Sequence, residues 1–149
     1  MDIYLVRTSR TTDQGFLSLE GRQMIRALGN KLRLNEEPSF DRFVTSPAPA
    51  AIQTAELFAD RVDYVGLVEV LPGLANDVPA QVVAPLLLSS GTTIAVVGDE
   101  PGLSALGAFL VGRPTFPPLQ PAQVSLIRDR QPAWCWRPGE IGRSQLLVA

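Results

Sequence analysis

Histidine is absent from this chain of 149 residues, and cysteine occurs only once, at Cys135. Without an imidazole, the protein has no histidine to serve as nucleophile, general base or metal ligand, and a zinc site built from His and Cys is excluded. A single cysteine cannot form an intrachain disulfide, which favours a reducing compartment. We therefore expect a cytoplasmic protein with no metal and no other cofactor.

Long apolar runs and a basic surface are missing as well. After the first apolar run, the longest covers residues 82–88, is interrupted by Pro85 and is too short to cross a bilayer. The apolar run at residues 3–6 has no basic segment before it, so it is not a signal peptide. With a net charge of -2, the chain offers no basic stripe for nucleic acid. We expect neither membrane nor nucleic acid among its partners.

What the chain does contain is an alternation of apolar strands and amphipathic helical segments. Strands are expected over residues 3–6, 42–45, 65–71, 92–97, 124–128 and 133–136, and helices over 18–34, 49–62, 79–89 and 103–111. A proline-rich segment, 114–121, is expected to be a surface loop. This order predicts one α/β domain over residues 1–149, a three-layer α/β/α sandwich with a mostly parallel sheet. The final hairpin adds antiparallel pairing at one edge.

In such a sheet, ligands bind outside the carboxyl ends of the strands. The segments that follow the first, second and fourth strands are therefore the candidate site. These segments are residues 7–10, 46–50 and 98–101.

The three segments resemble blocks of the histidine phosphatase superfamily, in particular its short SixA-type phosphohistidine phosphatases. Arg7 matches the arginine of the family's Arg-His-Gly signature, but Thr8 stands in place of the nucleophilic histidine. Ser46 opens a block similar to Ser-Pro-x-x-Arg-x-x-x-Thr, in which Ala50 replaces the phosphate-binding arginine. Asp99 replaces the second histidine. The resemblance implies a phosphoglycerate mutase-like fold with a degenerate phosphate pocket.

These substitutions predict a catalytically inactive protein with no catalytic residue and with a binding or regulatory role. Arg7 and Asp99 together are formally neutral where the family's pocket is cationic, so we expect the two to form an ion pair that fills the cavity. Arg10 is an alternative second positive group, although an exposed loop arginine is the expected reading. The partner is an unidentified protein, with phosphorelay proteins as one candidate, or a small molecule.

Two other functions remain open on the residues alone. One is a small-molecule binder that kept the cleft and changed its ligand, to a neutral or cationic one given Asp99. The other is a phosphatase of altered chemistry, with Thr8 and Asp99 as reacting groups. An aspartate of ordinary pKa is poorly matched to removing a threonine proton, which counts against this second alternative.

Overall fold

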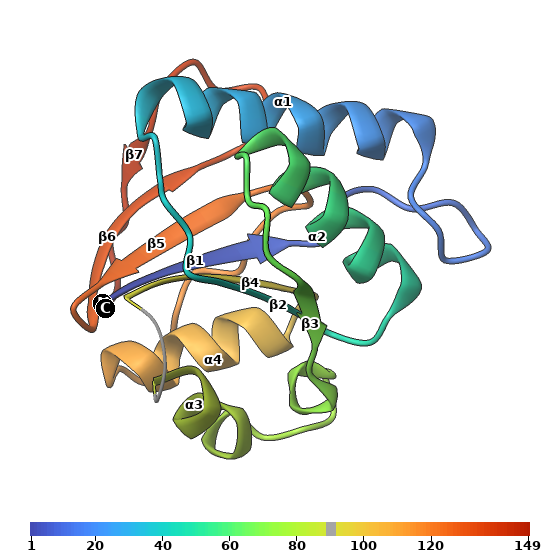
Figure 1. Ribbon diagram of the computed structural model, residues 1–149. Helices are drawn as coiled ribbons and strands as arrows, with labels where there is room; N and C mark the ends of the chain where they lie inside the picture. Colours follow the sequence, from blue (N-terminus) through green and yellow to red (C-terminus); the bar gives the residue numbers. More distant parts are fainter. Residues whose placement is uncertain (89–91) are drawn as a thin grey trace.

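A computed structural model describes residues 1–88 and 92–149 of the chain (Figure 1). The strands are β1 (Asp2–Arg7), β2 (Arg42–Thr45), β3 (Val68–Val70), β4 (Thr93–Gly98), β5 (Val124–Arg128), β6 (Gln131–Trp136) and β7 (Ser144–Gln145). The α-helices are α1 (Leu19–Asn35), α2 (Pro49–Arg61), α3 (Ala80–Leu88) and α4 (Gly102–Val111), and a short 3₁₀ helix covers Pro72–Leu74. The last residue of the helix expected over 79–89 lies outside the described residues.

The strands form one seven-stranded sheet in the order β3-β2-β4-β1-β5-β6-β7. The pairs β3–β2, β2–β4 and β4–β1 are parallel, and β5, β6 and β7 continue the sheet with antiparallel pairing. Helices α1 and α2 cover one face, and α3 and α4 cover the other (Figure 1). The predicted three-layer α/β sandwich with a mostly parallel centre and an antiparallel edge is therefore confirmed.

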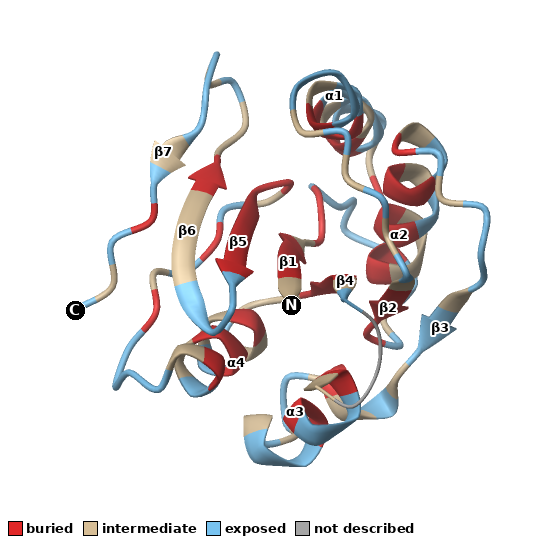
Figure 2. Ribbon diagram, turned by 60° about the vertical axis from the view of Figure 1, so that its left-hand side comes forward, coloured by how far each residue is buried: buried red, intermediate tan, exposed pale blue. Residues whose placement is uncertain are grey.

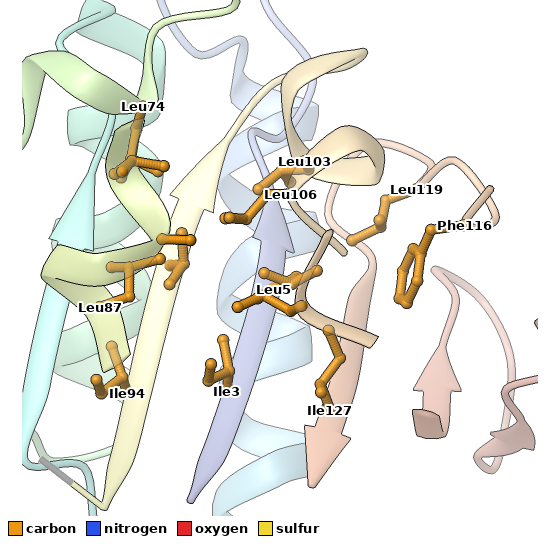
Figure 3. Close-up of a cluster of buried hydrophobic side chains, with 14 of the residues drawn as sticks. Ile3, Leu5, Leu74, Leu87, Ile94, Leu103, Leu106, Phe116, Leu119 and Ile127 are labelled. Atoms are coloured by element: carbon orange, nitrogen blue, oxygen red, sulfur yellow. The ribbon is translucent and has the colours of Figure 1, made fainter. Parts of the chain in front are cut away.

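The hydrophobic core lies on both faces of the sheet, because side chains alternate along each strand. In β1, Ile3 and Leu5 pack under α3 and α4, whereas Tyr4 and Val6 pack under α1 and α2. Figure 3 shows the first of these clusters. The central strands β1 and β4 are buried on both sides (Figure 2), so they hold the residues that follow them in fixed positions.

The start of α1 ties the loop after β1 to the helix. The Ser18 side chain caps the helix by accepting a hydrogen bond from the Gly21 N–H at 2.9 Å. The Ser18 N–H in turn donates to the Arg10 carbonyl at 3.0 Å. Gly21 lies directly against that carbonyl, at a place where a Cβ atom would clash with it. The close approach therefore requires glycine, and it anchors the loop that contains Arg10.

Three expectations from the sequence need correction. The segment 114–121 has no helix or strand, as expected, but Phe116 and Leu119 are only 4% and 2% exposed. The segment is therefore part of the core and not a purely surface loop. The strand expected over 65–71 is reduced to β3, and β7 was not predicted.

None of the helices in residues 1–88 and 92–149 has the length and apolar character needed to cross a bilayer.

Candidate functional site

Three of the predicted site residues meet at the carboxyl edge of the sheet. Thr8 follows β1, Ser46 follows β2 and Asp99 follows β4. In the sheet, β4 lies between β2 and β1. Backbone hydrogen bonds fix the arrangement: the Thr8 N–H donates to the Gly98 carbonyl at 2.8 Å, and the Ser46 N–H donates to the Val97 carbonyl at 2.9 Å. The parallel register thus brings together residues that are far apart in the sequence.

A cleft of about 340 Å³ opens at this edge. Its size lies within the range of small-ligand pockets. The residues that line it come from the loops after β2 and β4 and from the segment after β3: Ser46, Pro47, Ala48, Leu74, Ala75, Asn76 and Asp99. The predicted filling of the cavity by an ion pair is therefore wrong.

The Asp99 carboxyl is partly buried and lines this cleft. Burial raises the pKa of Asp99 above its ordinary value of 3.8, and the nearby Glu100 carboxylate raises it further. A hydrogen bond from the Thr8 hydroxyl and the positive charge of Arg7 lower the same pKa, but burial has the larger effect. The Thr8 side chain is 3% exposed, and its hydroxyl donates a hydrogen bond to the Gly98 carbonyl at 3.2 Å. The Thr8 hydroxyl and the Asp99 carboxyl therefore lie next to each other, beside the positive charge of Arg7.

Arg7 does not form the predicted ion pair with Asp99. Within residues 1–88 and 92–149, no carboxylate lies within ion-pair distance of the Arg7 guanidinium. Its Nη1 instead donates to the Leu119 carbonyl at 2.7 Å, and its buried Nε has no hydrogen-bond partner among the described residues. The partner of the Arg7 guanidinium is therefore the Leu119 carbonyl and not the predicted Asp99 carboxylate. The Asp99 carboxyl lines the cleft instead.

Ser46 and Ala50 differ in what they contribute. Ser46 is 4% exposed and lines the cleft, and its Oγ has no hydrogen-bond partner among the described residues. An unpaired buried hydroxyl costs free energy unless a ligand or water satisfies it. Ala50 lies buried in the first turn of α2 and carries no polar group toward the cleft.

Arg10 lies away from the cleft. Its side chain is 58% exposed and pairs with Glu20 of α1 at 3.2 Å. The anchored loop described above holds its backbone against Gly21. Arg10 is thus an exposed loop arginine in this structure, and it does not line the cleft.

The sequence did not single out Leu119 or Asn76. The Leu119 carbonyl holds Arg7, although Leu119 comes from a proline-rich segment 112 positions later in the chain. Asn76 lines the cleft, and its side chain bridges the Glu100 carbonyl, at 3.1 Å, and the Gly102 N–H, at 2.9 Å. No sequence pattern marks either contact, since both depend on how distant loops pack.

A second hollow, of about 470 Å³, lies near the amino ends of β2 and β3. Phe40 and Tyr64 line it, and the ion pair between Arg33 and Asp63 occupies part of its wall. It brings together none of the predicted site residues. In the part of the chain that the structure describes, no three acidic or cysteine side chains cluster as a metal site would require.

No protein-family model matches the sequence. No characterised protein matches it by sequence either. Among solved structures, the chain is similar to the protein histidine phosphatase SixA in complex with tungstate, with a TM-score of 0.80 at 19% identity over 97% of both chains.

Two further solved structures are similar across most of their length. A phosphoserine phosphatase variant from Entamoeba histolytica, in complex with phosphoserine, gives a TM-score of 0.67 at 16% identity, covering 89% of this chain and 93% of that one. An α-ribazole phosphatase from Shigella flexneri gives a TM-score of 0.67 at 18% identity, covering 99% of this chain and 95% of that one. At these identities the similarity shows the fold.

These comparisons contradict the prediction of a catalytically inactive protein. That prediction was drawn from the missing histidines, yet the solved structures that share this fold are phosphatases. The sequence argument also discounted Asp99 as a base of ordinary pKa, whereas burial raises the pKa of its carboxyl. Missing histidines change which groups are available for chemistry, and they do not by themselves establish inactivity.

Proposed function

We propose that this chain, which has the fold of the SixA-type histidine phosphatases, hydrolyses phosphorylated compounds with an aspartate in the proton-transfer role. The observation that carries the proposal is the Asp99 carboxyl, which lines the cleft beside Thr8 and Arg7 and has a raised pKa. A base whose pKa lies closer to neutrality is better matched to proton transfer at physiological pH. The structural neighbours, which act on phosphoryl groups, supply the substrate class.

In the proposed reaction, a water molecule in the cleft attacks phosphorus and gives its proton to the Asp99 carboxylate. The bond from phosphorus to the leaving oxygen or nitrogen breaks, and the protonated Asp99 returns the proton to the leaving group. The products are inorganic phosphate and the dephosphorylated compound. The Thr8 hydroxyl, which lies beside the carboxyl, favours its ionised form.

Two further groups stabilise charge on the phosphoryl oxygens. Arg7 places a positive charge beside Asp99, and only its Nη1 has a hydrogen-bond partner among the described residues, so other N–H groups remain to bind an oxyanion. The Ser46 hydroxyl has no partner among the described residues, and it donates to a phosphoryl oxygen in this scheme.

The test is hydrolysis of p-nitrophenyl phosphate and of a phosphohistidine peptide by wild type, Asp99→Asn and Asp13→Asn. Asp13 is an exposed loop carboxyl and serves as the control. We expect turnover by wild type and by the Asp13 variant, and a loss on the order of 10²-fold or more in Asp99→Asn. Activity should also rise as pH increases through the pKa of Asp99. Wild type without turnover, or Asp99→Asn with full turnover, would contradict the proposal.

The two substrates separate two partner classes, a phosphorylated small molecule and a phosphorylated protein side chain. The preferred substrate has the higher kcat/KM. The cytoplasmic location expected from the single cysteine belongs to this proposal as well. Cys135 is buried, so it has no exposed thiol for pairing with another chain.

A further inference from the structure

Glu100, the neighbour of Asp99 in the sequence, joins two separate backbone segments. Its Oε1 accepts a hydrogen bond from the Ser104 N–H at 2.8 Å, in the first turn of α4. Its Oε2 accepts one from the Leu119 N–H at 2.7 Å. Both carboxylate oxygens are therefore occupied, and Glu100 does not line the cleft.

Leu119 connects this carboxylate to the arginine of the site. Its N–H is bonded to Glu100, and its carbonyl accepts the Arg7 Nη1 at 2.7 Å. The Leu119 side chain is 2% exposed and packs in the same core cluster as Leu103 and Leu106 of α4 (Figure 3). The backbone of Leu119 is thus held on both sides, by a carboxylate and by a guanidinium.

An arginine side chain has many rotamers, and fixing one of them costs conformational entropy. A binding group works best when neighbouring groups hold it in the bound geometry before the ligand arrives. Arg7 receives such support from one carbonyl, and the position of that carbonyl depends on the Glu100 carboxylate. Hydrogen bonds to charged groups are the stronger ones, so this carboxylate is a firm anchor.

We propose that Glu100 is a positioning residue for Arg7: it fixes the backbone of Leu119, whose carbonyl holds the guanidinium at the carboxyl edge of the sheet. The proposal rests on the proposed function, in which Arg7 neutralises phosphoryl oxygens. A competing explanation is that Glu100 only stabilises the first turn of α4 through Ser104. In that case its removal would lower stability and leave Arg7 unchanged.

The test compares Glu100→Gln with wild type and with Glu56→Gln, an exposed glutamate of α2. The first measurement is the ¹⁵N NMR signal of the Arg7 Nε–H group, assigned by its loss in Arg7→Lys. The second is the dissociation constant of orthovanadate. We expect the Arg7 signal to shift or broaden in Glu100→Gln and vanadate affinity to fall about tenfold, which corresponds to about 1.4 kcal/mol. The Glu56 variant should match wild type in both.

The outcomes separate this proposal from the proposed function. An unchanged Arg7 signal in folded Glu100→Gln overturns the positioning role, even if wild type binds vanadate and hydrolyses phosphate esters. A changed signal supports the role, even if wild type does neither, and only the proposed function then fails.

A second variant, Glu100→Asp, covers the case in which Glu100→Gln does not fold. The same signals are recorded in Glu100→Asp, whose shorter side chain keeps the charge but cannot reach both the Ser104 and the Leu119 N–H groups, and on wild type as the reference. An Arg7 Nε–H signal that stays at its wild-type position in Glu100→Asp, while the Leu119 amide signal moves, overturns the proposal.

Discussion

At the scale of single residues, the site is defined by the surroundings of one carboxyl. Two neighbours of Asp99 favour its ionised form and lower its pKa, the hydroxyl of Thr8 and the positive charge of Arg7. Burial nevertheless outweighs both and raises the pKa of Asp99. The absence of a direct Arg7 ion pair explains this balance, because a guanidinium in contact would have lowered that pKa strongly. The Leu119 carbonyl holds the Arg7 Nη1, and Arg7 forms no ion pair with Asp99.

The raised pKa makes a prediction about stability. Between the ordinary value of 3.8 and the higher folded value, the folded protein binds a proton that the unfolded chain has released. Wild type therefore loses stability as pH rises through the folded pKa of Asp99. Asp99→Asn is neutral at every pH and escapes this loss. We expect its Tm at pH 7 to exceed that of wild type by on the order of 2 °C, a small shift because the carboxyl is only partly buried.

The measurement is Tm as a function of pH by calorimetry. The difference between Asp99→Asn and wild type should be largest at neutral pH and should disappear below about pH 3.8, where Asp99 is protonated in both states. Asp13→Asn provides the reference for an exposed carboxyl. A difference that grows toward acid pH would mean that the folded state favours the ionised Asp99.

At the scale of elements, the site depends on loops held by backbone contacts. The loop after β1 meets the start of α1 through the hydrogen bonds of Ser18 and the close approach of Gly21 to the Arg10 carbonyl. The segment 114–121 is held in a similar way, by Phe116 packing closely on Gly107 of α4, where an added Cβ would lie 2.7 Å from the ring. In both places a glycine in a helix lets a loop approach the helix backbone.

Gly21→Ala tests the first of these contacts. The added methyl would collide with a backbone carbonyl that cannot rotate away, so the loop or the helix must shift. We expect a loss of on the order of 2 kcal/mol in the free energy of unfolding, measured by urea denaturation. The matched control is Gly142→Ala, since a Cβ at Gly142 meets nothing within 4 Å. Equal stability of the two variants would show that the contact at Gly21 is loose.

At the scale of the whole molecule, the sheet separates two apolar layers that share the same central strands. Phe58 of α2 belongs to the layer under α1 and α2, and Phe116 belongs to the layer under α3 and α4. Strands β1 and β4 contribute side chains to both layers, so neither layer can form without them. Chains of this length usually unfold in one cooperative step.

We therefore predict that Phe58→Ala and Phe116→Ala each lower the midpoint of one and the same unfolding transition. The expected cost is about 3–5 kcal/mol each, because both side chains are buried, at 0% and 4% exposure. Phe16→Ala is the control, with a side chain that is 48% exposed. Urea denaturation followed by circular dichroism and by tryptophan fluorescence checks this. Two separate transitions would contradict the prediction of a single domain over residues 1–149.

The sequence alone predicted all four α-helices and every strand except β7, and it placed the candidate site residues after the ends of strands. These features follow from local patterns: the apolar run of β1, the Ser18 cap of α1, and the position of Thr8, Ser46 and Asp99 after strands. Local patterns repeat at short spacing, so they can be read without knowing what packs against them. The burial of Leu119 could not be recognised in this way, because prolines mark a loop and say nothing about where it packs.

Only the tertiary structure determined which groups contact Arg7 and how far Asp99 is buried. Opposite charges on neighbouring strand ends predicted an ion pair between Arg7 and Asp99, but the Leu119 carbonyl reaches Arg7 from 112 positions away. The pKa of Asp99 likewise depends on burial by several loops at once, which no spacing along the chain encodes. The chemistry of the site is therefore a property of long-range packing, since contacts between distant loops set both the position of the guanidinium and the protonation of the carboxyl.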